Sequence, residues 1–423
     1  MPLRRASGAA LVVAALLGGC GGGDHPRKKP VAPRASPGPA KGTVGPPPDA
    51  PALALGITEQ NPNFIWPEGS RPVPPEFARW RDELAEIHPA YYRVVIDWAS
   101  LQPEGGKPPI FDSPNGGCLR DLPPCGGYAG LRDVFKALAA RQKADGGWQA
   151  LVVLTGTPEW AAAPPSGCER PSTQPRSRPP TPGYGMKAYG VFARFVLEEA
   201  RRDGVDLRYW SPWNEPNHPF FISPQRKRCD LSARSAAVDP YVEMTRTLKA
   251  ALDEAPGDQE LVLGELAGLP DRRAKSASVS EFIADVPTEL ACGVKVWSQH
   301  GYIGGVNPVD DVERALKRKG CATPALWITE TGVGAPRRGE DRRTSRASQL
   351  AACRFLHRRL VRWLEDDRVT AAFQYTFRED DRFPTGLVKT DLSGSFPALR
   401  ELKAWGGHAR PNATDPAPPE SCR

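Results

Sequence analysis

The sequence predicts an α/β fold, a closed (β/α)8 TIM barrel, preceded by a signal peptide and a disordered proline-rich tether. Eight short apolar or β-branched runs alternate strictly with stretches whose apolar residues recur at helical spacing, and this alternation is typical of parallel sheets. Eight such units are the number that closes a barrel. No glycine-rich dinucleotide fingerprint follows the first run, which disfavours an open doubly wound sheet.

Each expected strand is a short run of apolar, aromatic or β-branched residues. The second is the clearest, because Tyr91 to Asp97 combines aromatic and β-branched residues. The strands are expected at residues 52–57, 91–97, 150–155, 207–213, 261–265, 294–300, 325–330 and 371–377.

The expected helices place apolar residues three and four positions apart, as Phe77, Trp80, Leu84 and Ile87 illustrate in the first one. A helix with this pattern turns one apolar face toward the sheet. The helices are expected around residues 75–88, 131–138, 192–197, 241–252, 279–286, 312–316, 350–364 and 396–405.

The amino terminus has the pattern of a bacterial export signal, expected over residues 1–19. Arg4 and Arg5 precede an apolar stretch, residues 9–17, that is too short to span a bilayer as a mature helix. The following Leu-Gly-Gly-Cys resembles a lipobox, whose Cys20 becomes the lipidated first mature residue. An ordinary secretory leader is the alternative. We therefore expect an exported protein, lipid-anchored at Cys20 to the outer face of the bacterial cell membrane, or secreted.

The remainder divides into three parts. Residues 20–51 contain nine prolines and no aromatic residue, and such a segment buries too little apolar surface to fold. We expect a disordered tether there, the barrel domain over residues 52–408 and a tail over residues 409–423.

The formal charge of +7 is concentrated near the amino terminus. Residues 1–50 hold seven Lys or Arg and two Asp, a net of +5, which leaves +2 for the other 373 residues. A net charge of +2 over these residues does not give the concentrated positive surface that binds DNA or RNA. We expect no nucleic-acid partner, and we expect a monomer.

Eight cysteines remain once Cys20 is set aside. An even number in an exported chain predicts disulfides, although many connectivities are open. None forms a C-x-x-C pair, which disfavours a zinc site. Proximity along the chain favours the pairs Cys118–Cys125, Cys168–Cys229, Cys292–Cys321 and Cys353–Cys422.

Two of the expected strands end in a glutamate. The fourth runs into Trp213-Asn214-Glu215-Pro216-Asn217, and the seventh into Trp327-Ile328-Thr329-Glu330-Thr331-Gly332. In parallel barrels, the carboxyl ends of the strands carry the chemistry. Two carboxyl groups facing each other, one protonated and one ionised, are the minimum equipment for cleaving a glycosidic bond.

The first motif resembles the acid/base signature of clan A glycoside hydrolases, and the second resembles the nucleophile strand of that clan. The pattern over about residues 52–406 is most similar to family 39, with family 5 next. This resemblance implies a retaining glycosidase acting on a cell-surface or extracellular polysaccharide or oligosaccharide, with Glu215 as acid/base and Glu330 as nucleophile. Retention implies carboxyl groups about 5–5.5 Å apart, and inversion roughly 6.5–9.5 Å. No cofactor is implied.

The same resemblance implies roles for other residues. Arg93 matches the family 5 arginine that orients the nucleophile, and a structural ion pair is the alternative. Asn214 would bind the sugar 2-hydroxyl, and a side chain that caps a loop is the alternative. Tyr302 would donate to Glu330. His300 would contact a sugar or a carboxylate, and a buried structural histidine is the alternative.

Aromatic residues are the other expected substrate contacts, because tryptophan faces stack on sugar rings. Of the tryptophans near strand ends, Trp160 is expected to bind substrate together with Tyr375, although core packing is the alternative for each tryptophan. The others are Trp98, Trp213 and Trp297. Many clan A members place a tryptophan at the end of the last strand, whereas here Tyr375 and Phe377 precede a charged run. The preferred sugar is therefore not predicted.

Two proline-rich insertions, residues 103–128 and 164–182, follow strands and are expected to form walls of the cleft, and a rigid surface flap without ligand contact is the alternative for each. The pKa of Glu215 is expected to be raised by the second carboxylate and by burial, while Glu330 is expected to stay ionised. A non-catalytic carbohydrate-binding lipoprotein would keep the aromatic residues without needing the carboxylate pair. A transglycosylase would pass the glycosyl group to a sugar instead of water.

Overall fold

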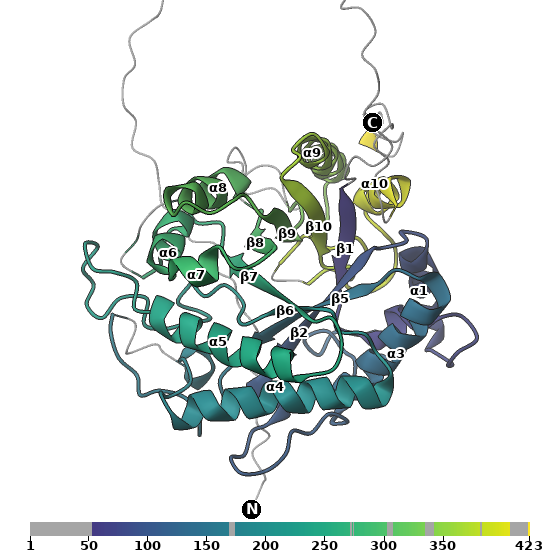
Figure 1. Ribbon diagram of the computed structural model, residues 1–423. Coiled ribbons are helices and arrows are strands. Elements are labelled where there is room, and N and C mark those ends of the chain that lie inside the picture. Colours follow the sequence, from purple (N-terminus) through teal and green to yellow (C-terminus); the bar gives the residue numbers. More distant parts are fainter. Residues whose placement is uncertain are drawn as a thin grey trace, which may run out of the picture.

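The computed structural model describes residues 53–168, 174–270, 273, 275–302, 308–334, 342–380, 383–406 and 422–423. In this part of the chain, eight parallel strands close into a barrel in the order β1-β10-β9-β8-β7-β6-β5-β2, with helices around it (Figure 1). The predicted (β/α)8 TIM barrel is confirmed. The expected signal peptide, the lipidation site at Cys20 and the tether lie outside the described residues, as does most of the expected tail.

The barrel strands match the predicted runs closely. They are Ala54–Thr58 (β1), Tyr91–Asp97 (β2), Gln149–Thr155 (β5), Tyr209–Ser211 (β6), Glu260–Leu266 (β7), Val296–His300 (β8), Ala325–Thr331 (β9) and Val369–Tyr375 (β10). A small antiparallel hairpin lies in the insertion after β2; its strands are Pro114–Asn115 (β3) and Tyr128–Ala129 (β4).

A helix follows each barrel strand, as predicted. These helices are α1 (Pro75–Ala85), α3 (Gly130–Asp145), α4 (Tyr184–Asp203), α5 (Val238–Glu254), α6 (Val279–Asp285), α8 (Pro308–Arg318), α9 (Arg346–Leu364) and α10 (Pro397–Trp405). Short helical turns lie between them at η1 (Pro62–Phe64), α2 (Trp98–Leu101), η3 (Pro175–Ser177) and α7 (Thr288–Ala291).

Strand β6 is shorter than the predicted run of residues 207–213. Pro212 has no N–H group, so it cannot continue the ladder, and the strand ends at Ser211. Strand β10 likewise ends at Tyr375, two residues before the predicted end at Phe377. In both places the chain leaves the sheet early and enters the carboxyl-end loops of the barrel.

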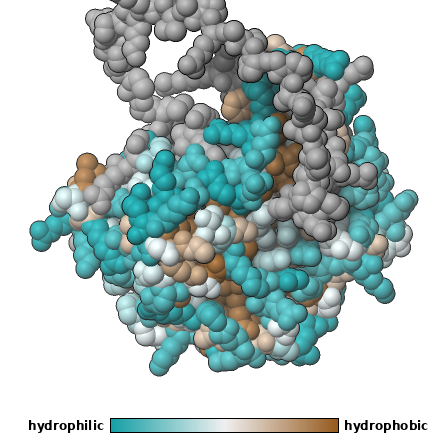
Figure 2. All heavy atoms as spheres, turned by 45° about the horizontal axis from the view of Figure 1, so that its top comes forward, coloured by the Kyte–Doolittle hydropathy of each residue, from teal (hydrophilic) through white to brown (hydrophobic). Residues whose placement is uncertain are grey.

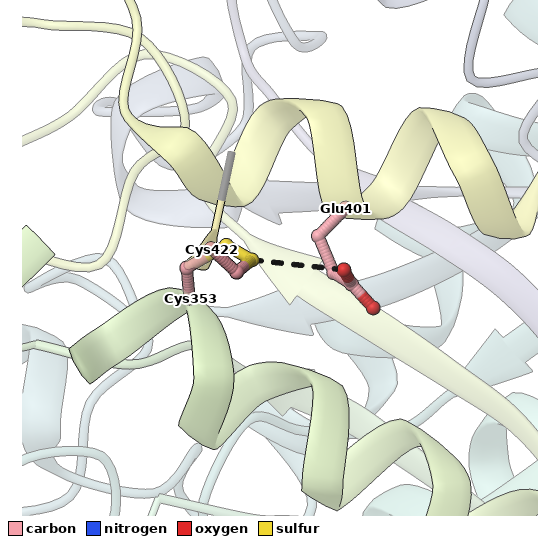
Figure 3. Close-up of side chains that lie close together, drawn as sticks. All are labelled: Cys353, Glu401 and Cys422. Atoms are coloured by element: carbon pink, nitrogen blue, oxygen red, sulfur yellow. Dashed lines mark hydrogen bonds between the residues drawn. A yellow bond between two sulfur atoms is a disulfide. The ribbon is translucent and has the colours of Figure 1, made fainter. Parts of the chain in front are cut away.

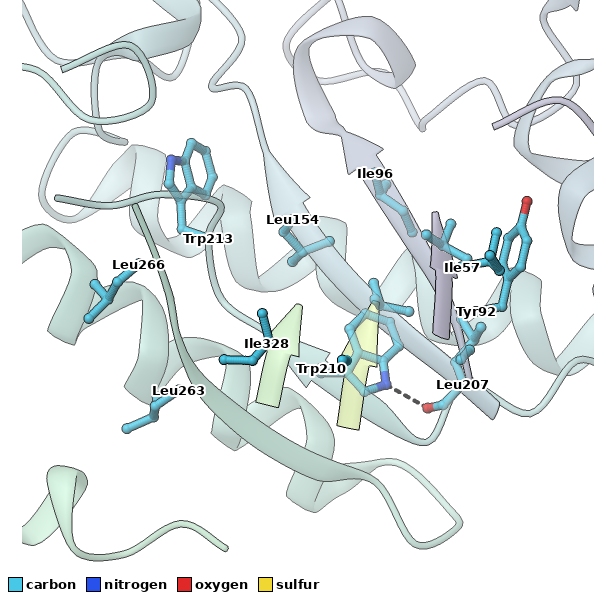
Figure 4. Close-up of a cluster of buried hydrophobic side chains, with 14 of the residues drawn as sticks. Ile57, Tyr92, Ile96, Leu154, Leu207, Trp210, Trp213, Leu263, Leu266 and Ile328 are labelled. Atoms are coloured by element: carbon cyan, nitrogen blue, oxygen red, sulfur yellow. Dashed lines mark hydrogen bonds between the residues drawn. The ribbon is translucent and has the colours of Figure 1, made fainter. Parts of the chain in front are cut away.

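Two apolar cores flank the strands. Outward-facing side chains such as Tyr92, Leu154 and Ile328 pack beneath the helices (Figure 4). Inside the barrel, a smaller cluster contains Trp327, whose ring centroid lies 4.7 Å from that of Tyr91 at the start of β2. This cluster fills the amino-terminal end of the barrel, so the polar residues of the interior gather at the carboxyl end.

All four predicted disulfides are present: Cys118–Cys125, Cys168–Cys229, Cys292–Cys321 and Cys353–Cys422. The last ties the end of the chain to α9, beside the buried Glu401 of α10, whose Oε2 lies 3.8 Å from the Sγ of Cys422 (Figure 3). Such a set of disulfides fits an oxidising, extracytoplasmic compartment.

The face in Figure 2 is largely hydrophilic, with a narrow strip of hydrophobic residues running between hydrophilic ones. None of the helices in the described part of the chain combines the length and the apolar composition that a membrane crossing requires.

Candidate active site

The two strand-end glutamates meet at the carboxyl end of the barrel. One oxygen of Glu215, one oxygen of Glu330 and a ring nitrogen of His300 all lie within 4.8 Å of one another. Both glutamates line a cavity of about 280 Å³, which is close to the lower end of the range found for small-molecule sites. The structure thus brings together two carboxyl groups that stand 115 positions apart in the sequence.

A β-bulge turns Glu330 toward this cavity. In β9, Trp327 faces the barrel interior and Ile328 faces the helices, so strict alternation would point Glu330 outward. The register with β8 shifts between Gln299 and His300, and the register with β10 shifts at the same level. A bulge of this kind re-aims the next side chain, and here it delivers the carboxyl group of Glu330 to the interior.

The backbone around Glu215 is tied to both neighbouring strands. The N–H of Asn214 donates to the carbonyl of Leu154 (3.1 Å), and the N–H of Glu215 donates to the carbonyl of Glu265 (2.9 Å). Glu215 has a φ of 37°, a conformation that a non-glycine residue adopts only when its surroundings hold it there.

Asn217 fixes the loop that follows. Its side-chain oxygen accepts the N–H of Ala267 (2.8 Å), and its amide donates to the carbonyls of Ala267 (2.9 Å) and Ala277 (3.1 Å). Asn217 therefore fixes the backbone two positions after Glu215 and helps to hold the orientation of the carboxyl group.

Arg93 joins the two halves of the site. This fully buried side chain forms an ion pair with Glu330 (Nη1 to Oε1, 2.7 Å). It donates through Nε (3.0 Å) and Nη2 (2.6 Å) to Glu265 Oε2, and through Nη2 (2.6 Å) to Asn214 Oδ1. Both expectations for Arg93 thus have a counterpart in the structure, since it contacts the nucleophile candidate and also forms a structural ion pair with Glu265.

Tyr302 and His300 reach the site from the carboxyl end of β8. The hydroxyl of Tyr302 donates to Glu330 Oε2 (2.8 Å). The Nδ1 of His300 lies 2.7 Å from Glu215 Oε1, and its Nε2 lies 3.4 Å from Glu265 Oε2. His300 is therefore placed as a carboxylate contact, buried among three glutamates.

The expected raised pKa of Glu215 is wrong for this structure. Burial by itself raises that pKa, but the hydrogen bond and the positive charge of His300 outweigh burial and lower it. Burial would also lower the pKa of His300, yet the carboxylates of Glu330, Glu215 and Glu265 raise it to about 10. The contact between the two side chains thus contributes to pKa shifts in opposite directions.

Glu265, at the end of the fifth expected strand, is the third glutamate of this site, and it forms a structural ion pair with Arg93. It is fully buried. Burial by itself raises the pKa of Glu265, but the charge of Arg93 and the hydrogen bond from His300 lower it to about 2. The sequence feature that could have indicated the inward position of Glu265 is Gly264, because a glycine inside a strand run often marks a bulge.

The cavity is lined by residues at the strand ends and in the loops that follow them, and the segment after β10 contributes Thr376, Asp380 and Phe383. Phe383 packs edge-on against Tyr302 (4.9 Å) and against Tyr375 (5.3 Å), so an aromatic wall replaces the tryptophan that is absent at the end of β10. Across the cavity, Arg120 pairs with Asp380 (2.5 Å). Sequence reasoning identified Tyr375 and Tyr302 but neither Phe383 nor this ion pair.

The insertion over residues 103–128 contributes one residue, Arg120, to the lining of the cavity. Arg120 lies in the short loop closed by Cys118–Cys125 and lines the cavity. The described residues of the insertion over 164–182 are not among those that line it.

Trp160 is not among the residues that line the cavity. It is partly buried, its indole N–H donates to the carbonyl of Gln102 (3.0 Å), and its ring packs edge-on against Trp98 (5.6 Å). Trp98, Trp213 and Trp297 are completely buried core residues. Their N–H groups donate to Gln102, Phe221 and Ala291, respectively.

Two side-chain clusters among the described residues have the composition of metal sites. One consists of Cys353, Glu401 and Cys422, but its two sulfurs are bonded to each other in a disulfide (Figure 3). The other is Glu215, His300 and Glu330, whose ligand atoms hydrogen-bond within the network just described. Neither cluster needs an ion to account for its geometry.

No protein-family model matches the chain, and no curated protein matches it. Solved structures do match. A conserved exported protein from Bacteroides fragilis is 16% identical, with a TM-score of 0.55 over 85% of this chain and 79% of that one. A GH30 endoxylanase from Clostridium papyrosolvens is 11% identical, with a TM-score of 0.50 over 85% and 73%.

An endo-β1,6-glucanase is also 11% identical, with a TM-score of 0.51 over 84% of this chain and 76% of its own. At these identities the likeness establishes a shared fold. The chain therefore has the barrel architecture of known glycoside hydrolases, while its assignment to family 39 and the roles of its residues stay predictions.

Proposed function

We propose that this protein is a retaining glycoside hydrolase that cleaves O-glycosidic bonds of a cell-surface or extracellular polysaccharide or oligosaccharide. Glu215 is the acid/base and Glu330 the nucleophile. The observation that supports this most is the meeting of the two carboxyl groups, within 4.8 Å at their nearest oxygens, in one sugar-sized cavity. This separation favours retention, because inverting enzymes keep roughly 6.5–9.5 Å between the carboxyl groups to admit a water.

In the first half-reaction, an oxygen of Glu330 attacks the anomeric carbon while Glu215 gives a proton to the departing oxygen. Arg93 forms an ion pair with Glu330, and Tyr302 donates a hydrogen bond to it, so both hold its carboxylate in place for attack. The product is a covalent glycosyl–enzyme ester, and the aglycone leaves as an alcohol.

In the second half-reaction, Glu215 takes a proton from a water that attacks the same carbon, and Glu330 is released as a carboxylate. Asn214 lines the cavity next to Glu215 and is held by Arg93. We assign its amide to the sugar 2-hydroxyl, a contact that strengthens in the oxocarbenium-like transition state. We also assign His300, Tyr375 and Trp160 to binding of the sugar.

The proposed substrate class follows from fold and location. Two of the similar structures are an endoxylanase and an endo-β1,6-glucanase, so polysaccharides are substrates of proteins with this fold. We propose that Cys20 carries a lipid that holds the enzyme at the outer face of the bacterial membrane, where a cell-surface glycan lies within reach. A secreted form would meet the same class of substrate.

A panel of aryl glycosides and extracellular polysaccharides tests the proposal. We expect hydrolysis of at least one of them, and we expect Glu330→Ala to lower kcat by roughly 10⁴-fold or more. Glu254→Gln is a matched control, because Glu254 is a surface residue paired with Arg194, and it should keep full activity. A folded Glu330→Ala enzyme of normal activity would refute the assignment, and binding without turnover by the native protein would favour the carbohydrate-binding alternative.

A further inference from the structure

His300 is held between carboxylates on both sides of its ring. Its Nδ1 faces Glu215 Oε1 (2.7 Å) and Glu330 Oε2 (3.5 Å), and its Nε2 faces Glu265 Oε2 (3.4 Å). His300 is 1% exposed and Glu265 is 0% exposed. The other charged or titratable groups at this cluster are Arg93, Tyr302, Tyr375 and His218.

Hydrogen-bond chemistry limits where the protons of this cluster reside. A carboxylate can only accept, and an imidazole nitrogen facing a carboxylate must therefore donate. Either both nitrogens of His300 carry a proton, or one of the facing carboxyl groups does. The short contact between Nδ1 and Glu215 Oε1 makes these two descriptions differ by the movement of one proton along a single hydrogen bond.

We propose that Glu265 is a positioning residue in a Glu265–His300–Glu215 relay, where it retains the Nε2–H of His300 so that the Nδ1 proton passes to Glu215. The inference rests on the proposed glycosidase function, and it gives a role to a third carboxylate that does not touch the sugar. The raised pKa of His300 and the lowered pKa of Glu215 agree with a proton stored on the ring until substrate excludes water.

The proton balance of the relay is complete. Nδ1 gives its proton to Glu215 Oε1, and Glu215 gives that proton to the departing oxygen as the glycosyl–Glu330 bond forms. His300 is then neutral, with its remaining proton on Nε2 and held by Glu265. When water attacks the ester, Glu215 takes a proton from it, and this proton returns to Nδ1.

The fold holds Glu265 firmly for this purpose. Its N–H donates to Ser298 Oγ (2.8 Å), its carbonyl accepts the N–H of Glu215 (2.9 Å), and its carboxylate accepts two N–H groups of Arg93. A bulge in β7 and a φ of 49° turn its side chain inward. The side chain of Glu265 thus holds the Nε2 end of the relay. Its backbone holds the loop that carries Glu215.

Nuclear magnetic resonance of the imidazole nitrogens tests the relay without using activity. The chain has six histidines, and the signals of His300 are those that disappear in His300→Gln. In the native protein we expect both nitrogens of His300 to be protonated through pH 8. In Glu265→Gln, which keeps the shape and loses the charge, we expect His300 to titrate about one to three pH units lower. A neutral His300 at pH 7 in the native protein overturns the proposal, even if the variant does not fold.

Kinetics separate a relay from a merely structural role. For Glu265→Gln we expect kcat/KM to fall by roughly 10²-fold with an alkyl leaving group, which needs the proton, and much less with a 2,4-dinitrophenyl group of the same sugar. The basic limb of the kcat/KM profile should move to lower pH, because the variant holds the relay proton less tightly. Equal losses with both leaving groups and an unmoved limb would refute the relay while Glu330→Ala still reports on the proposed function.

Discussion

At the scale of single residues, Arg93 organises the site, because one guanidinium contacts Glu265, Asn214 and Glu330. A planar fork can serve several acceptors at fixed angles, whereas a lysine ammonium is a single point of charge. The geometry of both the sugar-contact candidate and the nucleophile candidate therefore depends on this side chain.

We expect Arg93→Lys to lower kcat/KM by roughly 10²-fold, because a small misplacement of a catalytic group costs about that much. Lysine keeps the positive charge, so the loss in kcat/KM measures the contribution of the guanidinium geometry and not that of the charge. Arg132→Lys is the control, since Arg132 pairs with Glu199 and Asp112 away from the cavity and should leave kinetics unchanged. Steady-state kinetics on the best panel substrate measure both variants, and unchanged kinetics in Arg93→Lys would contradict this role.

A second prediction at this scale concerns acid stability. The pKa of Glu265 is about 2 in the folded protein, below its ordinary value of 4.5. A lowered folded pKa contributes stability that is complete above the unfolded pKa and is lost as the pH falls toward the folded one. Between pH 5 and pH 2 the free energy of unfolding of Glu265→Gln should therefore fall less steeply than that of the native protein, as measured by urea unfolding. Parallel curves would contradict the burial of an ionised Glu265.

The sequence predicted several of the residues that meet at the carboxyl end of the barrel, since Glu215, Glu330 and Tyr302 follow or end strand runs and Arg93 lies within one. Electrostatics was harder to predict. The raised pKa expected for Glu215 assumed burial beside a carboxylate, and the strength of the contact with His300 depends on side-chain placement that spacing does not show.

At the scale of elements, two bulges decide which glutamates enter the barrel. Strict alternation would turn Glu330 and Glu265 outward, and register shifts in β9 and β7 turn them inward. In β7 the bulge passes through Gly264, with a φ of 110°, where an added Cβ would lie 2.0 Å from the carbonyl oxygen of Ser298.

We expect Gly264→Ala to destabilise the fold by about 1–3 kcal/mol more than Gly204→Ala does. Both glycines have positive φ, but a Cβ at Gly204, which caps α4, meets nothing within 4 Å, so that variant carries the backbone strain alone. Thermal and urea unfolding measure the difference. Activity should fall in Gly264→Ala only, because its bulge carries Glu265, and equal effects of the two variants would show that the close contact with Ser298 is unimportant.

The segment after β10 shows where prediction from sequence stops. Phe383 lies eight positions beyond Tyr375 in a loop without a repeating pattern, yet its ring packs against Tyr375 and Tyr302. Periodicity locates strands and helices because their geometry repeats. A loop has no such repeat. The aromatic wall and the pair of Arg120 with Asp380 could therefore be identified only in the structure.

At the scale of the whole molecule, the alternation of strands and helices was enough to predict the barrel, since every expected unit corresponds to an observed one. Eight strand–helix units are the number that closes a (β/α)8 barrel, so this was the closed fold that the sequence predicted. The disulfides were predicted from proximity alone, and they add covalent ties that the alternation pattern does not require.

The disulfides should differ in what they contribute. Cys353–Cys422 spans 69 positions and Cys118–Cys125 spans seven, so loop-closure entropy predicts losses of about 4 and about 2 kcal/mol, respectively, when each pair is replaced by serine. The first replacement should leave kcat/KM unchanged. The second should lower it, because its loop holds Arg120 against the cavity. Unfolding curves and kinetics of the two double variants check both statements, and a larger stability loss for the short loop would contradict them.

The central claim is that Glu330 forms a covalent bond to the sugar while Glu215 supplies the proton. Incubation with a 2-deoxy-2-fluoro 2,4-dinitrophenyl glycoside of the preferred sugar, followed by protease digestion and mass spectrometry, tests it most directly. We predict one fluoroglycosyl group on the peptide that contains Glu330, and none in Glu330→Gln. A label on another carboxylate, or no label from a sugar that the enzyme turns over with inversion, would contradict the claim.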